Sequence, residues 1–473
     1  MLARVGKRWI GVGAVLALLL LAAPAVLGET AASGSAPAAA GAAGAAGAAG
    51  AAATAAAAAP APKIDSGDTA WLLVSAALVL LMTPGLAFFY GGLVRRKNIL
   101  SVLMQCFAIL CLISIQWYAL GYSLAFGPDV GGFIGNLSWA GLKGVGAAPD
   151  PMGYASTVPH QAFMVFQMMF AVITPALIIG AFAERIKFSS FCVFSLLWAT
   201  LVYDPVAHWV WGAGGFLRTM GALDFAGGTV VHINAGLSAL AAAIVLGRRQ
   251  GYPDDVSPPH NLPFAVLGAA LLWFGWFGFN AGSALTAGGL AASAFTATHL
   301  ATAAAGLTWC VLDWVKYKRP TTLGMITGAV AGLVAITPAS GFVDPTGAIC
   351  IGIGAGVFPW LAVTYVKTRF NYDDSLDAFG VHGIGGIWGA LATGLWATKA
   401  VNAAGADGLF YGNPKQLLIQ AAAVGTTIVF AFVGSLVLFK LVDATVGLRV
   451  TDHQERVGLD LTQHKEAAYT QIE

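Results

Sequence analysis

Apolar runs long enough to cross a lipid bilayer recur along this sequence from Trp71 onward. A transmembrane helix needs about 20 consecutive apolar residues, so each run indicates a membrane span. Several runs contain Gly or Pro, which membrane helices tolerate when neighbouring helices satisfy the freed backbone groups. The sequence therefore predicts an all-α polytopic membrane protein with eleven transmembrane helices, at residues 69–93, 100–126, 163–183, 189–211, 227–247, 262–284, 291–315, 322–337, 346–366, 380–398 and 417–441.

The composition supports the same class of protein. Of the 473 residues, 58% are hydrophobic and 10% are charged, whereas about a quarter of the residues in a soluble domain are charged. A chain of this kind could not cover its surface with polar groups in water, so contact with membrane lipid is expected. The formal net charge of +2 gives no reason to expect nucleic acid as a partner.

Basic residues alternate between the connections that join these runs. The connections after the first, third, fifth, seventh and ninth runs carry clusters of them, namely Arg95, Arg96, Lys97, Arg185, Lys187, Arg248, Arg249, Lys316, Lys318, Arg319, Lys367 and Arg369. The even-numbered connections carry only Lys143, Arg218, Lys399 and Lys415. By the positive-inside rule the clustered connections are cytoplasmic, which places the mature N-terminus outside and the C-terminus inside.

Residues 1–28 have the pattern of a secretory signal peptide. Three basic residues precede an apolar run at 10–21, and small alanines follow it. The run is short and ends at Pro24, which favours cleavage over a first membrane helix. A cleaved signal agrees with an external N-terminus, and it indicates a bacterial plasma (inner) membrane.

Residues 29–64 form an Ala/Gly-rich tract with a GAA triplet period. The tract has too little proline for a collagen helix and too little apolar bulk for a core, so we expect a disordered linker. The rest of the chain divides into a transmembrane domain at 65–443 and a cytoplasmic tail at 444–473.

Two histidines lie inside predicted spans, where polar groups are costly and often functional. His232 lies in the fifth span and His382 in the tenth, and an aspartate precedes each by eight residues, Asp224 and Asp374. The two spans run in opposite directions, as an inverted repeat of spans 1–5 and 6–10 would produce. A hydrogen bond between helices could also explain a lone histidine, but the matched spacing and glycine-rich settings favour function. Asp224 could equally cap a helix, and the two roles are compatible.

A metal centre is not expected. Two histidines do not complete a zinc shell, and no carboxylate or thiolate lies nearby in sequence as a third ligand. The five cysteines all lie in apolar runs without metal-ligand spacing, which is typical of small buried hydrophobic residues. Neither a metal nor a cofactor is therefore predicted.

Aromatic residues form a second cluster. Its members are Phe166 and Phe170 in the third span, Trp211 at the end of the fourth, and Trp276 and Phe279, with the hydroxyl of Ser283, in the sixth. Such residues often serve packing or an interfacial belt. An aromatic box with a hydroxyl can also hold an ammonium-type cation, at up to about 2 kcal/mol per desolvated face. His208, in the same segment as Trp211, is expected to be solvated at the outer interface.

At these residues the sequence closely resembles the ammonium transporter (Amt/Rh) family, in its bacterial Amt branch. The resemblance covers about residues 65–460. Its motifs are FAVITPALIIGAFAER (170–185), HWVWGAGG (208–215), GALDFAGGTVVHINAG (221–236), PHNLPFAVLGAALLWFGWFGFNAGSA (259–284), DAFGVHGIGGIWG (377–389) and DATVGLRVTDHQERVGLD (443–460). The Ala/Gly tract and Pro175 depart from the family pattern.

The resemblance implies an arrangement and a set of site residues. It implies a homotrimer with one pore per subunit and eleven spans per chain. It implies recruitment of ammonium by Asp224, Trp211, Phe170, Ser283 and Ala226, and a gate formed by Phe170 and Phe279. His232 and His382 match the family's twin pore histidines, and Trp276 matches a pore-lining tryptophan.

The resemblance also implies regulation from the cytoplasm. Family members receive a PII-type signal protein on their inner face, and the tail here keeps Gly447, Leu448, Arg449 and Glu455. A tail that only packs across the neighbouring subunit is the alternative.

Elementary energetics agree with transport of ammonium as ammonia. A bare cation in an apolar pore costs far more than aromatic faces return, whereas a neutral amine costs little. We expect ammonium, and methylammonium as a candidate second substrate, to lose its proton at the gate. The histidines, kept neutral by desolvation, would relay the proton separately. An ammonium sensor using the same site is the alternative function. An enzyme is not expected, because no nucleophile or metal set accompanies the histidines.

Overall fold

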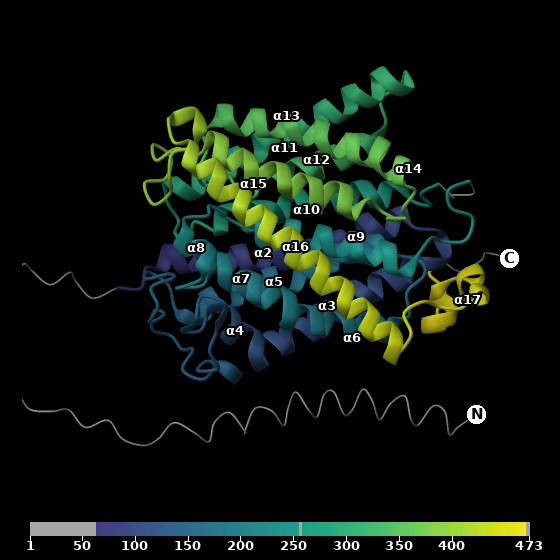
Figure 1. Cartoon of the computed structure of the whole chain (residues 1–473), viewed down its shortest axis with the longest axis horizontal. Helices are drawn as coiled ribbons and strands as arrows, with labels where there is room; N and C mark the ends of the chain where they lie inside the picture. The colour runs from purple at the N-terminus through teal and green to yellow at the C-terminus, as the bar shows by residue number, and fades with distance from the viewer. Residues whose placement is uncertain (1–62, 255–257, 470–473) are drawn as a thin grey trace, which may run out of the picture. The chain divides into compact units, whose positions relative to one another are not determined.

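The computed structural model describes residues 63–254 and 258–469, which are mainly helical (Figure 1). The predicted signal peptide and nearly all of the predicted linker lie outside the described residues. The α-helices are α2 (Ser66–Leu93), α3 (Ile99–Gln116), α4 (Tyr122–Phe126), α5 (His160–Phe182), α6 (Phe188–Trp198), α7 (Asp204–Trp211), α8 (Phe216–Met220), α9 (Asn234–Leu246), α10 (Leu262–Gly282), α11 (Gly289–Tyr317), α12 (Thr322–Ile336), α13 (Pro345–Leu361), α14 (Lys367–Phe370), α15 (Gly385–Trp396), α16 (Pro414–Thr445) and α17 (Asp452–Val457).

Shorter elements interrupt and join these helices. The π-helical segments are η2 (Trp117–Gly121), η4 (Ala199–Tyr203), η5 (Gly228–Ile233), η6 (Ala362–Val366), η7 (Phe379–Ile384) and η9 (Asp460–His464). The 3-10 helices are η1 (Arg96–Asn98), η3 (Ala140–Leu142) and η8 (Leu409–Tyr411). One antiparallel hairpin joins β1 (Asp129–Val130) to β2 (Ile134–Gly135), with Asp129 opposite Gly135.

Nine helical segments of the described chain are long and apolar enough to cross a membrane. They are Ser66–Leu93, Arg96–Phe126, His160–Phe182, Phe188–Met220, Gly228–Leu246, Leu262–Gly282, Gly289–Tyr317, Pro345–Phe370 and Pro414–Thr445. The eighth predicted span coincides with α12, which is apolar but only 15 residues long. The tenth coincides with η7 and α15, where glycines and His382 lower the hydropathy. These two segments account for the difference between nine and the eleven predicted.

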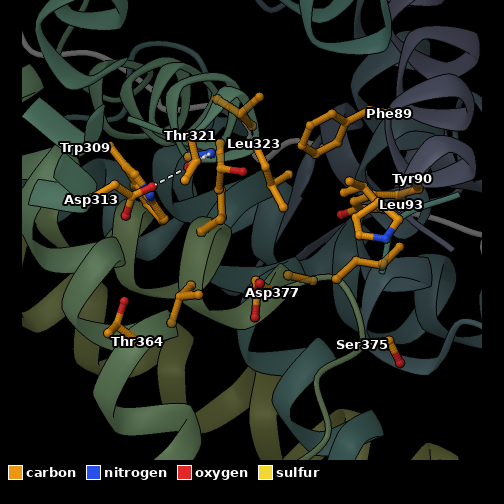
Figure 2. A pocket seen from close by; sticks show the side chains of 18 of the residues that line it. Phe89, Tyr90, Leu93, Trp309, Asp313, Thr321, Leu323, Thr364, Ser375 and Asp377 are labelled. Atoms are coloured by element: carbon orange, nitrogen blue, oxygen red, sulfur yellow. Dashed lines mark hydrogen bonds between the residues drawn. The ribbon is translucent and has the colours of Figure 1, made fainter. Parts of the chain in front are cut away.

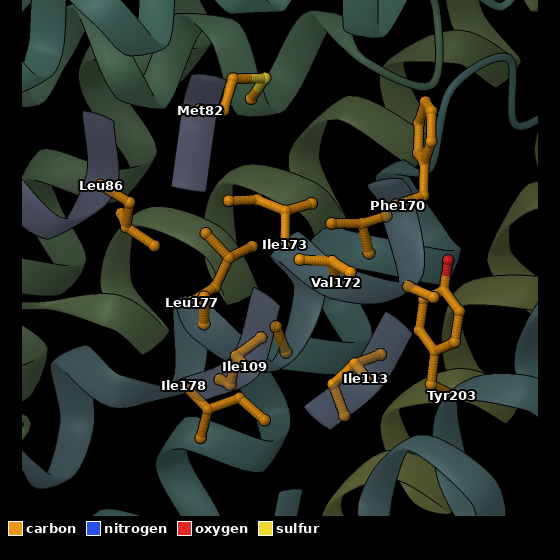
Figure 3. Packing of buried hydrophobic residues seen from close by; sticks show 14 of the residues in the cluster. Met82, Leu86, Ile109, Ile113, Phe170, Val172, Ile173, Leu177, Ile178 and Tyr203 are labelled. Atoms are coloured by element: carbon orange, nitrogen blue, oxygen red, sulfur yellow. The ribbon is translucent and has the colours of Figure 1, made fainter. Parts of the chain in front are cut away.

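Helix α5 lies at the centre of the hydrophobic core. Nearly all of its side chains are buried. Figure 3 shows Ile173 and Leu177 of this helix beside side chains of α2 and α3, among them Met82 and Ile109. Pro175 lies inside α5 without ending it, so this departure from the family pattern leaves the helix continuous to Phe182.

Helix α16 runs obliquely across the other helices in Figure 1 and packs against α9, α15 and α6. The chain after α16 folds back onto the connection between α5 and α6. Here the Lys187 N–H donates to the Leu448 carbonyl (2.9 Å), and the Val450 N–H donates to the Arg185 carbonyl (3.0 Å). The tail is thus held by backbone hydrogen bonds to its own subunit.

Two expectations about single residues are wrong. His208 is fully buried and not solvated. Its ring nitrogens lie 2.9 Å from the Ala125 carbonyl and 2.9 Å from Asp129 Oδ1 on the hairpin, so protein atoms take the place of water. Cys111 is exposed on α3, and only Cys106 and Cys310 are buried among the five cysteines. A helix in an apolar solvent can be apolar all round, so an apolar run does not place its cysteines inside.

Candidate functional site

Three hollows follow one another through the helical body. The first, which we call the outer vestibule after the predicted orientation, has a volume of about 180 Å³. Its lining is mainly aromatic and comes from α4, α5, α7, α8 and the connections beside them. The lining residues are Phe126, Tyr154, Phe163, Gln167, Phe170, Val210, Trp211, Arg218, Phe225, Ser283 and Leu285.

Two buried phenylalanine rings close the inner end of the outer vestibule. The ring centroids of Phe170 and Phe279 are 4.2 Å apart. Phe170 lines the vestibule, and Phe279 lines the next hollow inward. Trp211 stands perpendicular to Phe170 at 5.8 Å, so one wall of the vestibule is continuous with the closed pair.

The second hollow, the histidine cavity, is enclosed and has a volume of about 10 Å³. A volume of this order holds about one water-sized molecule. His232 and His382 stack here with ring centroids 5.4 Å apart and an interplanar angle of 21°. Trp276 stacks on His232 at 5.4 Å, and Phe279 lies 6.0 Å from the same ring.

The histidine nitrogens are buried polar groups without protein partners. Within the described residues, Nδ1 and Nε2 of His232 and Nδ1 of His382 make no hydrogen bond. By contrast, the Trp276 indole N–H donates to Thr337 Oγ1 at 2.9 Å. Buried polar groups are almost always hydrogen-bonded, and leaving one unpaired is costly. The imidazole nitrogens are therefore available to a small polar ligand in this cavity.

Glycines allow the two histidine-bearing helices to cross in close contact. A methyl group at Gly236 of α9 would overlap the backbone of Gly383 in η7. A Cβ at Gly386 would lie 3.0 Å from the Cβ of His232. The glycine-rich setting of each histidine thus has a packing cause, because larger residues would separate the two rings.

Each histidine lies in a π-helical segment whose start is bound by the aspartate eight residues earlier. The Asp224 carboxylate accepts the N–H groups of Gly227, Gly228, Thr229 and Val230 at 2.6–3.1 Å, at the start of η5. The Asp374 carboxylate accepts those of Ala378 and Phe379 at 3.1 and 2.7 Å, at the start of η7. The capping interpretation of Asp224 is confirmed by these bonds.

Asp224 also connects its helix to the outer vestibule. Its carbonyl accepts the Trp211 indole N–H at 2.9 Å, and Ala226 lies fully buried in the turn that follows. Burial raises the pKa of Asp224, and the backbone N–H groups act in the opposite direction. Burial likewise raises the pKa of Asp374, to about 6.

Ser283 lines the outer vestibule with its hydroxyl already oriented. The Ser283 O–H donates to the Phe279 carbonyl at 2.8 Å, one helical turn earlier. Because the proton is used in this bond, the hydroxyl oxygen is left as an acceptor. A cation with N–H groups in the vestibule could donate to it.

The third hollow, the inner vestibule, has a volume of about 440 Å³ (Figure 2). His382 and Val330 line both this hollow and the histidine cavity, so the two adjoin. Asp313 and Asp377 are carboxylates in its wall, and Figure 2 shows the bond from Thr321 to Asp313. The inner vestibule is therefore wider and more polar than the histidine cavity.

Sequence reasoning placed the main site residues but missed several others. The structure brings Phe170, Trp211 and Ser283 to one hollow, and His232, His382, Trp276 and Phe279 to the next. The sequence analysis missed Asp313, although an acidic residue within a predicted span was a usable signal. It also missed Tyr154 and Arg218, which lie in connections where nothing in the sequence indicates proximity to Trp211.

Comparisons with known proteins agree on one family. The sequence model described as Ammonium Transporter Family matches residues 70–469. An ammonium transporter of Bacillus subtilis (strain 168) is 55% identical over 403 residues, covering 85% of this chain and 98% of the relative.

Solved structures of other proteins share this fold. The crystal structure of Candida albicans Mep2 aligns with a TM-score of 0.79 and 36% identity, covering 86% of this chain and 91% of that one. A protein named Sensor Amt Protein aligns with a TM-score of 0.77 and 30% identity, covering 84% and 98%.

Proposed function

The chain belongs to the Ammonium Transporter Family, and from this premise we propose that its three hollows form one path for ammonium across the bacterial plasma membrane. Ammonium enters the outer vestibule, loses its proton beside the Phe170/Phe279 pair and continues inward as ammonia. The observation that carries the proposal is the histidine cavity, which combines unpartnered imidazole nitrogens with a volume of about 10 Å³.

Recruitment is proposed to depend on cation–π contact and on the field of Asp224. Phe170 and Trp211 present aromatic faces to the vestibule, and Ser283 offers a hydroxyl acceptor. Asp224 stands behind Trp211 with its carboxylate fully used by backbone N–H groups. Its role would be to hold the turn containing Ala226 and to supply negative potential, without direct contact with the cation.

Deprotonation is proposed to follow from the cost of dehydrating a cation. The paired rings of Phe170 and Phe279 offer no hydrogen-bond acceptor to an ion, whereas neutral ammonia passes such a barrier at far lower cost. The unpartnered nitrogens of His232 then hydrogen-bond the amine on the inner side. The same two imidazoles relay the released proton along a separate route.

The finer topology is part of this proposal. We place eleven spans in an inverted repeat of 1–5 and 6–10, with the N-terminus outside and the C-terminus inside. The matched local structure of Asp224 with η5 and of Asp374 with η7 supports such a repeat. A homotrimer and a PII-type partner on the inner face complete the proposal, with a cleaved signal at 1–28, a disordered linker at 29–64 and a tail from 444.

The second candidate function is an ammonium sensor with little flux. The sensor stays a candidate because a solved structure of similar fold is named Sensor Amt Protein. Flux separates the two candidates, since a sensor needs binding alone.

The test uses the full chain reconstituted into vesicles and given an outside ammonium gradient. We expect ammonium-dependent current or internal alkalinisation, which protein-free vesicles should not show. Asp224→Ala should lose both signals, although the purified variant should elute from a sizing column at the wild-type volume. Ammonium binding without either signal would overturn transport in favour of the sensor.

A further inference from the structure

Arg218 places a cation at the mouth of a hollow that we propose to recruit a cation. It lies in α8, is exposed to solvent and lines the outer vestibule together with Phe170, Trp211 and Ser283. Within the described part of the chain, no carboxylate forms an ion pair with it. Its positive charge is therefore not neutralised by a direct partner.

Arg218 occupies two groups that could otherwise serve an incoming cation. Its guanidinium carbon lies 5.7 Å from the centroid of the Tyr154 ring, within the range of a cation–π contact. Its Nη1 donates to the Trp211 carbonyl at 2.6 Å. One aromatic face and one carbonyl of the vestibule are thus engaged by the protein itself.

Tyr154 is fixed in place for this contact. Its hydroxyl donates to the Phe126 carbonyl at 3.0 Å and accepts the Ala213 N–H at 2.7 Å. Its ring stacks on Phe163 at 5.2 Å with an interplanar angle of 4°. Burial raises the pKa of Tyr154 to about 12, so the phenol stays neutral and does not offset the charge of Arg218.

From this geometry we infer that Arg218 lowers the affinity of the outer vestibule for ammonium. Its guanidinium repels an incoming cation, and it occupies the Tyr154 ring face and the Trp211 carbonyl, which that cation could otherwise use. A consequence is that the vestibule accepts a cation only at the remaining faces of Phe170 and Trp211. The inference rests on the proposed function and deepens it.

The expected effect is on the apparent affinity and not on the saturated rate. Arg218 lies outside the Phe170/Phe279 pair, so its removal leaves the constriction and the histidine cavity unchanged. One unit charge a few ångströms away in a partly hydrated site changes a binding constant by on the order of two- to tenfold. Salt near 1 M should reduce the difference, because the screening length there is about 3 Å, which is comparable with this separation.

The experiment measures ammonium-dependent current against ammonium concentration for the full chain and for Arg218→Gln and Arg218→Lys. Lys143→Gln is the matched control, because Lys143 is an exposed cation of an external connection that does not line the vestibule. We expect Arg218→Gln to lower KM by about two- to tenfold at low ionic strength, with an unchanged maximal current. Arg218→Lys retains the charge and should lower KM less than Arg218→Gln does, whereas Lys143→Gln should keep the wild-type KM.

Other outcomes would overturn the inference. An unchanged or raised KM in Arg218→Gln would contradict it. A lowered maximal current at constant KM would assign Arg218 a structural role in holding Trp211. An equal drop in KM for Arg218→Lys would show that charge is not the cause. Absence of current and ammonia flux in the wild type would instead refute the proposed function, so the two failures are distinguishable.

Discussion

The imidazole rings of His232 and His382 stack 5.4 Å apart although 150 residues separate them in the sequence. Their helices can approach this closely because glycines meet at the crossing, Gly236 against Gly383 and Gly386 against His232. Each ring is held in a π-helical segment that begins at an aspartate-bound turn. The constriction is thus built by two segments far apart in the chain, each with glycines and a histidine in a π-helical turn.

Gly236→Ala is expected to separate the two histidine helices. The added methyl would overlap the Gly383 backbone, and overpacking of this kind typically costs about 1–3 kcal/mol. We expect a lower Tm in detergent and a reduced ammonium current. Gly425→Ala on α16 is the control, because a Cβ there meets nothing within 4 Å. Equal Tm values for the two variants would contradict the close-crossing argument.

Phe279→Ala is expected to weaken discrimination against metal cations. Removing the ring opposite Phe170 opens the apolar barrier between the outer vestibule and the histidine cavity to water. A hydrated barrier costs an ion less, so potassium should begin to compete with ammonium in flux assays. Phe274→Ala, an exposed residue of the same helix, is the control. Unchanged potassium exclusion in Phe279→Ala would show that the pair is not the barrier.

Glu184→Gln is expected to destabilise the end of the helical body that carries Arg95 and Arg249. The buried Glu184 carboxylate accepts from Arg95, Asn98 and Arg249 at 2.8–3.0 Å. Burial of Glu184 alone would raise its pKa, but Arg249 and Arg95 outweigh it and hold that pKa below its ordinary value. Breaking a buried pair typically costs about 3–5 kcal/mol.

The pH dependence of that loss follows from the lowered pKa of Glu184. The charged form is the stabilising one, so the stabilisation is fully present above the unfolded pKa of about 4.3. It is lost progressively as the pH falls from there through the lower pKa of the folded state. Thermal melts should therefore show a Tm gap between wild type and Glu184→Gln at pH 7 that shrinks below about pH 4. Exposed Glu466→Gln is the control. A gap that persists at low pH would mean that packing, and not charge, is lost.

The spans and the paired Asp-to-His spacing could be predicted because each depends on local sequence. Apolar runs fix where helices lie, and Asp224 and His232 are eight residues apart in one segment. The boundaries of α2 and α10 agree with the predicted runs to within a few residues.

Other features depend on contacts between distant segments and could not be predicted. Burial of His208 requires the β1–β2 hairpin to place Asp129 over its ring. The close approach of α9 to η7 depends on glycines from both segments, Gly236 and Gly383. Arg218 reaches the vestibule only because α8 turns back beside Trp211. The periodicity of the sequence does not predict contacts between segments that are far apart in the chain.

The most direct test of the proposed path is the ammonium-pulse current of the wild type and of the His232→Ala/His382→Ala double variant on a solid-supported membrane. The account predicts an ammonium-specific current in the wild type and its loss in the double variant, with unchanged elution from a sizing column. Undiminished current together with undiminished uptake in the double variant would contradict the proton relay through these two rings.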